Sequence, residues 1–490
     1  WWNDVWRMVA SQEKKPQGYL SCGSEAAHML RPLNLIGYPD VLLRHTAHRL
    51  KSPGMMAEAD FMDGEGNLHD GQRWDWVSSA GATGMHLLNL AEHYLATRDQ
   101  AWLQANRQRL QQAADWLIRQ RREYMKDVPN RDELWCAGLQ PPTTINESWG
   151  EHQYRWFFFT DAVSCEALFA FARALEDVDA ELAAKYAAEA RQYREDIRRS
   201  VERSIALTPV RRLRSGVYRS YSPGACYARG PFVTFQGGSG YGCEDWLHQD
   251  TLIRSLGWDP ADVRLAGSLE VLEDAYLFRE YSQALAKKRR ARGLAAEDDW
   301  FWSGFGRQLG WLSITDAHLA HDDVPAFLRS WINCSTLHIN WAKEGYRVTE
   351  GTDRVMGNHG VANNNAGGWL MRNFRNLLVM EIGDALWMAK ATPRHWLEQG
   401  KKIAVKNAPT YFGPAAYEIV SDVDNGRINA TVEIPSRNPP KEVILRFRHP
   451  KAAPIKGVTV NGKPWADFNK DKETITLKGL TGTVTVTAQY

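Results

Sequence analysis

The sequence predicts a mainly α-helical protein, an (α/α)6 barrel followed by a small C-terminal β-sandwich. Between residues 20 and 400, segments with helical periodicity alternate between a mostly apolar kind and an amphipathic, highly charged kind. The alternation occurs six times. After about residue 405, apolar and polar residues alternate instead, with many Val, Ile and Thr. We therefore place the barrel domain at residues 1–404 and the β-sandwich at residues 405–490.

The six apolar segments are rich in Gly, Ala and aromatic residues, which is typical of buried helices. They cover residues 24–38, 77–97, 155–175, 245–258, 305–320 and 363–381. The amphipathic segments, expected as outer helices, cover residues 39–50, 100–124, 180–204, 261–278, 322–334 and, less clearly, 384–400. Six buried and six half-exposed helices form an inner ring within an outer ring. An irregular bundle is the competing all-α architecture, and the absence of a strict period argues against a consensus solenoid.

The expected β-sandwich is built from short strands separated by turns. Strand patterns occupy residues 416–423, 426–434, 442–449, 457–465, 474–479 and 483–490. Asn461-Gly462 and the run from Asp424 to Gly426 are turn signals. Residues 407–414 form the expected linker. Few loop carboxylates and aromatics occur here, so we expect this domain to support the barrel.

Composition excludes several classes of function. The 490 residues carry a net charge of +2, which does not favour nucleic acid as a partner. No apolar run reaches the roughly 20 residues of a membrane span. The six Cys are scattered without a CxxC pair, so neither a metal site nor a dense disulfide framework is expected. Since the chain begins with Trp1 and not Met, we expect a processed form or a fragment, with a periplasmic or secreted location favoured. Nothing indicates an oligomeric state.

Tryptophan residues beside carboxylates point to a sugar ligand. The chain has 21 Trp, and four clusters recur in loops. They are Trp74-Asp75-Trp76, Glu147-Ser148-Trp149, Glu244-Asp245-Trp246 and Asp299-Trp300-Phe301-Trp302. An indole offers a flat apolar face, and a carboxylate accepts hydrogen bonds from paired hydroxyl groups. Core Trp beside helix N-terminal acids is the plainer alternative for any single cluster.

The position of these clusters predicts a pocket. Each lies just before or at the start of an apolar helix, and Glu350, Asn358 and His359 precede the sixth. In an (α/α)6 barrel the inner helices begin at one end, so the clusters would meet there. Glycoside cleavage needs one carboxylic acid to protonate the leaving oxygen and a second carboxylate to activate water or attack. Apolar Trp walls would raise the pKa of the acid.

Two segments resemble catalytic segments of six-hairpin glycoside hydrolases. "INESWGEHQYRWFFFTDAVSCEAL" (145–168) resembles the glucoamylase-type segment that carries the general acid. The resemblance implies that role for Glu147, with Glu151 or Glu25 as alternatives. "VTEGTDRVMGNHGVANNNAGGWL" (348–370) is similar to glucoamylase and α-L-rhamnosidase-like base segments. It implies that Glu350 is the base and that Asn358 and His359 contact sugar. "GLQPP" (138–142) also recurs in such enzymes.

The predicted function is therefore a glycoside hydrolase that acts on a polysaccharide or oligosaccharide, exo-acting and inverting, without cofactor or metal. The expected sugar-binding residues are Trp74, Asp75, Trp149, Glu151, Glu244, Asp245, Trp246, His248, Asp299, Trp300, Trp302, Asn358 and His359. A polysaccharide lyase or unsaturated-uronide hydrolase on a similar helical toroid is the alternative. The acidic motif that rhamnosidases carry before the first inner helix is absent, so the resemblance does not extend to rhamnose specificity.

Overall fold

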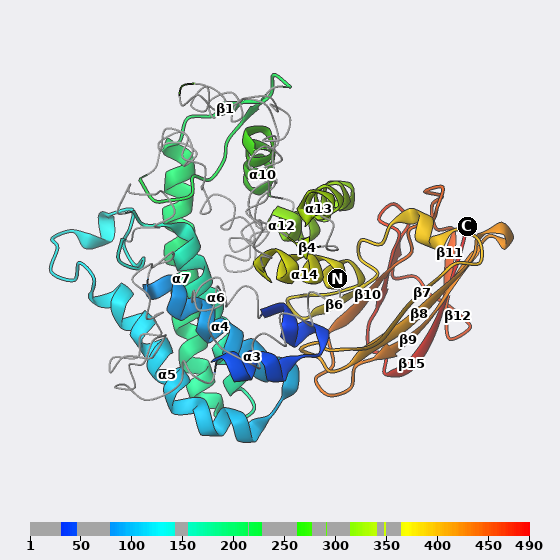
Figure 1. The fold of residues 1–490 in the computed structure, drawn as a ribbon, viewed down its shortest axis with the longest axis horizontal. Helices are drawn as coiled ribbons and strands as arrows, with labels where there is room; N and C mark the ends of the chain where they lie inside the picture. Colours follow the sequence, from blue (N-terminus) through cyan, green and yellow to red (C-terminus); the bar gives the residue numbers. More distant parts are fainter. Residues whose placement is uncertain are drawn as a thin grey trace.

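A computed structural model describes residues 31–46, 79–142, 155–213, 215–227, 262–276, 291, 314–340, 347–348 and 364–490. A helical part is followed along the chain by a β-rich C-terminal region that lies beside it (Figure 1). Within these ranges, no helix combines the length and the apolar character that crossing a bilayer requires.

Two long apolar helices form the centre of the helical part. They are α4 (Ser79–Thr97) and α6 (Phe158–Leu175). Both fall within segments that the sequence predicted as buried helices, and most of their side chains are buried. Apolar side chains, mainly Ala and Leu on α4 and Phe and Ala on α6, make up most of each helix surface, so both helices bury most of their circumference.

Amphipathic helices cover this pair on the outside. Helices α5 (Gln100–Glu123) and α7 (Ala180–Leu207) bury one apolar stripe each, as expected from their sequence. Each begins at an aspartate: Asp99 accepts a hydrogen bond from the backbone N–H of Trp102, and Asp179 from that of Leu182, both at 3.0 Å. These contacts satisfy donors that a helix start leaves open.

The remaining described α-helices also lie within predicted segments, except that the helix expected at residues 322–334 extends to His338. They are a helical stretch at residues 31–36, α3 (Pro39–Thr46), α10 (Val263–Tyr276), α12 (Ile314–Ala320), α13 (Val324–His338) and α14 (Asn364–Leu378). Two small antiparallel pairs join β1 (Arg211–Arg212) to β2 (Tyr218–Arg219) and β3 (Ile339–Asn340) to β4 (Arg347–Val348). The apolar segment 245–258 lies outside the described residues.

Helices α4 and α6 run parallel and start at the same end. Near their starts, a β-carbon at Gly84 would lie 2.9 Å from Ser164 Oγ and 3.0 Å from Ser164 Cα, so the two backbones approach closely. Near their ends, the Tyr94 hydroxyl donates to Asp177 Oδ2 at 2.9 Å. Helices α12 and α14 also lie together, because Asp316 pairs with Arg372 and accepts from Asn376.

The C-terminal region consists of two sheets that share one hydrophobic core. The six-stranded sheet contains β7 (Lys402–Ala408), β8 (Ala415–Asp422), β9 (Arg427–Ile434), β11 (Gly457–Val460), β12 (Lys463–Pro464) and β15 (Gly482–Gln489). The five-stranded sheet contains β5 (Val379–Ile382), β6 (Ala385–Met388), β10 (Glu442–Arg446), β13 (Phe468–Asn469) and β14 (Thr474–Leu477). Asn461 and Gly462, both with positive φ, form the predicted turn between β11 and β12.

The helix expected at residues 384–400 is wrong. Strand β6 occupies its first part and a short 3-10 helix, Arg394–Leu397, its second. Strand β6 pairs antiparallel with β5 and parallel with β10. Leu386 and Met388 face the core with period two, and Pro393 is incompatible with a helix interior. The five-stranded sheet therefore takes strands from both sides of residue 405.

Polar contacts join the β-rich region to α4. The Arg437 guanidinium donates to the backbone oxygens of Ala96 (2.9 Å) and Leu95 (3.4 Å) near the C-terminus of α4. Carbonyls there have no intrahelical partner, and a cation complements the helix dipole. The Tyr411 hydroxyl donates to Glu92 Oε1 at 2.7 Å, and Glu92 also pairs with Arg31. These contacts anchor the two parts to each other.

Candidate functional site

The residues predicted as catalytic or sugar-binding lie outside the described residues. They are Glu25, Trp74, Asp75, Glu147, Trp149, Glu151, Glu244, Asp245, Trp246, His248, Asp299, Trp300, Trp302, Glu350, Asn358 and His359. Their roles stay predictions. The described residues next to them show how the chain is held at the start of α4 and α6.

Asp161 anchors the chain that leads to the predicted acid. It lies buried in the first turn of α6. Its Oδ1 accepts from the backbone N–H of Gln140 at 2.7 Å and from the Tyr193 hydroxyl at 2.6 Å. The Gln140 side chain in turn donates to the backbone oxygen of Leu117 at 3.0 Å. Residue 140, seven positions before Glu147, is thus tied to α5, α6 and α7.

Burial raises the pKa of the Asp161 carboxyl to about 7. Desolvation disfavours the charged form, and it outweighs the hydrogen bonds from Tyr193 and Gln140 and the positive charge of Arg121, which favour that form. Asp161 therefore titrates near neutral pH although it is built into the packing of the helices.

Arg121 holds the preceding turn in place. Its Nε donates to the backbone oxygen of Gly138 at 2.9 Å, and its Nη1 pairs with Glu189 at 2.6 Å. It also pairs with Asp196 and lies over the Tyr193 ring, 4.2 Å from its centroid. Gly138 has φ +79, and a β-carbon there would lie 2.5 Å from Asp196 Oδ2, so this turn requires glycine.

An aromatic cluster lies just before the start of α6. Trp135 stacks on Tyr227 with ring centroids 4.9 Å apart, and Trp156 meets Tyr227 edge-on at 5.7 Å. The Trp135 backbone N–H donates to the Tyr227 hydroxyl at 3.1 Å, and the Cys226 N–H donates to the backbone oxygen of Trp156 at 2.9 Å. Tyr227 is 42% exposed. This cluster places an accessible aromatic ring at the end where α6 begins.

Tyr227 also has a backbone conformation that few bulky residues adopt. Its φ is +63, in the left-handed region. Such a conformation persists where the surroundings determine it, and it is enriched at functional sites. Here the surroundings are the Trp135 ring, which stacks on Tyr227, and the Trp135 backbone N–H, which donates a hydrogen bond to the Tyr227 hydroxyl.

Polar side chains are buried along the length of α4. Thr83, His86, Asn89, Glu92 and His93 follow one another at helical spacing. Glu92 binds Arg31 through two hydrogen bonds of 2.6 Å, and His93 Nδ1 lies 3.2 Å from Asn34 Oδ1. Burial lowers the pKa of His93 to about 4, which keeps the ring neutral at pH 7. The interior of the helical part is therefore partly polar.

The chain before Glu350 is held by a short strand. Strand β4 ends at Val348, two residues before Glu350, and pairs with β3. It also lies against α14, the helix that follows the predicted base segment. Among the described residues, no group of His, Cys, Asp and Glu could hold a metal ion.

Sequence reasoning missed Asp161 and the aromatic cluster. Asp161 sits inside an apolar helical run, where its partners on α5 and α7 leave no local signal. The residues of the cluster, Trp135, Trp156 and Tyr227, are up to 92 positions apart, so only the fold brings them together. One signal was present: "GLQPP" already marked the loop that Asp161 anchors.

Comparisons with known proteins give distant structural likenesses. No protein-family model and no curated protein sequence matches the chain. One similar solved structure is named "Glycoside hydrolase", with 10% identity, a TM-score of 0.43, and coverage of 100% of this chain and 76% of that one. An α-L-rhamnosidase from Dictyoglumus thermophilum is 9% identical, with a TM-score of 0.44; the match covers 95% of this chain but 46% of the rhamnosidase.

A GH76 α-mannanase from Bacteroides thetaiotaomicron is also similar, at 9% identity and a TM-score of 0.39, over 74% of this chain and 87% of that one. The solved structures reported as similar are thus glycoside hydrolases. With TM-scores below 0.5, these likenesses do not determine the activity of this chain.

Proposed function

We propose that the protein is an exo-acting, inverting glycoside hydrolase with Glu147 as general acid and Glu350 as general base. The observation that carries the proposal is the parallel course of α4 and α6, which start at the same end. The segments that lead directly into them contain Trp74 and Asp75 before α4 and Glu147 and Trp149 before α6. This shared start supports the proposal that the two acid–indole clusters meet at one end of the helical part.

The chemistry needs two carboxyl groups in different protonation states. Glu147 would protonate the leaving glycosidic oxygen, and Glu350 would take a proton from the water that attacks the opposite face of the sugar. An inverting reaction requires about 6.5–9.5 Å between the two carboxyl groups. Indole walls beside Glu147 would raise the pKa of its carboxyl by desolvation and keep it protonated. Glu350 would stay ionised in its polar, Asn-rich and Gly-rich surroundings.

The described anchors support this arrangement. Asp161 and Arg121 hold residues 138–140 against α6 and α5. In the proposal, this fixed stretch is the starting point of the segment that carries Glu147. Strand β4 pairs with β3 up to Val348, two residues before Glu350. Such positioning of reacting groups by a rigid scaffold is a large part of catalysis. The exposed ring of Tyr227 adds a surface on which a sugar can stack.

The architecture that fits this function is an (α/α)6 barrel of six helical hairpins within residues 1–404. Four described features support it: buried helices alternate with half-exposed ones, α4 and α6 are parallel, α12 and α14 lie together, and the interior carries polar side chains. In this proposal the region from residue 405 onward supports the barrel and takes no part in the chemistry.

The test is turnover of Glu147→Gln and Glu350→Gln on a panel of aryl glycosides and plant and algal polysaccharides, scored by released sugar. Each variant should lose about two orders of magnitude or more in kcat, because general acid–base catalysis contributes about that much. Glu123→Gln, at the exposed end of α5, is the matched control and should be unaffected. Near-normal turnover in both site variants, with melting temperatures unchanged, would refute the assignment.

A further inference from the structure

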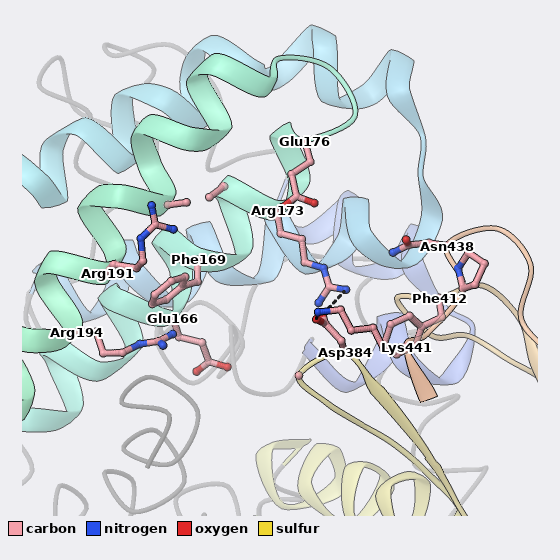
Figure 2. A pocket seen from close by; sticks show the side chains of 14 residues that line it. Glu166, Phe169, Arg173, Glu176, Arg191, Arg194, Asp384, Phe412, Asn438 and Lys441 are labelled. Atoms are coloured by element: carbon pink, nitrogen blue, oxygen red, sulfur yellow. Dashed lines mark ion pairs between the residues drawn. The ribbon is translucent and has the colours of Figure 1, made fainter. Parts of the chain in front are cut away.

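A cavity separates the outer face of the helical part from the β-rich region. Its volume is about 670 Å³, within the roughly 300–1,000 Å³ of small-molecule sites. Side chains of α6 and α7 form one wall, and the β5–β6 turn and the segment before β10 form the other. Figure 2 shows Arg191 and Arg194 on the α7 side, across from Lys441 and Asp384.

This cavity lies away from the proposed catalytic end. Its lining on α6 runs from Glu166 to Glu176, the C-terminal half of the helix and the residue after it. The catalytic proposal concerns the residues before Phe158. At about 1.5 Å per residue, Arg173 lies roughly 22 Å along the axis from Phe158. A ligand here would not compete with a sugar bound at the start of α6.

The acids of the cavity are largely committed to other partners. Asp384 pairs with Lys441 at 2.7 Å and with Arg173 at 3.7 Å. Glu166 pairs with Arg31 at 3.0 Å. Glu176, the exposed residue that follows α6, lies in Figure 2 well away from Arg194. In the part of the chain that the structure describes, no ion pair joins these carboxylates to Arg191 or Arg194, the two cations on the α7 side of the lining.

Arg194 is prepared for an anion. Its guanidinium lies 4.0 Å from the centroid of the Phe169 ring, within the range of a cation–π interaction. Its Nε is buried and has no hydrogen-bond partner. Within the described ranges, no ion pair involves Arg194 or Arg191. A partly buried guanidinium without a carboxylate is desolvated without compensation, and an oxyanion would supply the missing partner.

We propose that this cavity binds a small ligand through an oxyanion group, held by Arg191 and Arg194. A guanidinium presents its N–H donors in a planar fork that matches carboxylate and phosphate oxygens. Arg191 and Arg194 are three residues apart on α7 and share one helix face, so both can reach one group. The polar remainder of the cavity suits the hydroxyls of an acidic saccharide, and inorganic phosphate offers the same anionic chemistry.

Calorimetric titration of the full chain tests the proposal with three probes: digalacturonate, inorganic phosphate and the neutral disaccharide lactose. At least one anion should bind, more weakly at high salt, and lactose should not bind at this cavity. Arg191→Ala with Arg194→Ala should weaken anion binding by about tenfold or more. Arg198→Ala with Arg203→Ala, which removes two charges from α7 outside the lining, is the matched control.

The preferred probe identifies the source of the anion. Tighter binding of digalacturonate indicates an acidic saccharide, and tighter binding of phosphate indicates a small phosphate. Should the double alanine variant fail to fold, Arg191→Lys with Arg194→Lys is the alternative. It keeps both charges but loses the planar fork, so it should weaken anion binding, though less than removal of the charges would. The proposal is overturned if neither anion binds, or if the Arg191 and Arg194 variants bind anions as tightly as the unchanged protein.

Discussion

Gly84→Val tests the close parallel contact of α4 with α6. A β-carbon alone would lie 3.0 Å from Ser164 Cα and 3.1 Å from Ser164 N, and these backbone atoms cannot rotate away. Overpacking a filled core costs about 1–3 kcal/mol, and valine adds two more methyl groups against the same wall. Valine has a higher helix propensity than glycine, which offsets this cost by a few tenths of a kcal/mol. The free energy of unfolding should therefore fall by about 2–3 kcal/mol.

Urea unfolding followed by far-ultraviolet circular dichroism measures this loss in the helical part. Ala101→Val, on the exposed side of α5, is the control, since it introduces the same branched side chain without the contact and should cost about 0.5 kcal/mol. A Gly84→Val protein no less stable than Ala101→Val would mean that α4 and α6 do not approach as described. The parallel start of the two helices would then lose its support.

Three further predictions concern the anchors of the site. The pKa of Asp161, about 7 when folded and 3.8 unfolded, means that its contribution to stability is full below pH 4 and lost as pH rises to 7. In chemical unfolding at several pH values, the stability of the protein relative to Asp161→Asn should fall by roughly 4 kcal/mol over this range, whereas parallel profiles would contradict the assignment. Tyr227→Ala should raise KM up to about tenfold, since an aromatic contact contributes about 0.5–1.5 kcal/mol, and the exposed Tyr218→Ala should not; equal effects in steady-state kinetics would refute the stacking role. His93 should titrate near pH 4 by nuclear magnetic resonance, with stability lost as pH falls from 6.5 through 4, and a midpoint near 6.5 would show that it is hydrated.

Much of the helical part could be predicted from periodicity because inner and outer helices differ in their chemistry. The apolar run of α6 and the charged run of α7 each give a clear pattern, and both helices lie close to the expected bounds. Residues 384–400 misled because apolar residues such as Leu386 and Ala389 also occur there at helical spacing. The deciding interaction, parallel pairing of β6 with β10, joins residues more than fifty positions apart.

The site was less predictable for the same physical reason. A carboxylate such as Asp161 acquires its raised pKa from burial beneath other helices, against partners there that favour the charged form, and neither is written in the neighbouring residues. Tyr227 becomes a surface aromatic through a left-handed backbone and a stack on Trp135. Motif resemblance, by contrast, identified Glu147 and Glu350 directly, and these two roles stay predictions.

The separation of the carboxyl groups of Glu147 and Glu350 tests the proposed catalytic site most directly. A crystal structure of the Glu147→Gln protein with an oligosaccharide bound would measure it between the side-chain amide introduced at position 147 and the Glu350 carboxylate. The proposal predicts about 6.5–9.5 Å, with the sugar between the two groups at the start of α4 and α6. Two groups at opposite ends of the helical part, or both sealed from solvent, would contradict it.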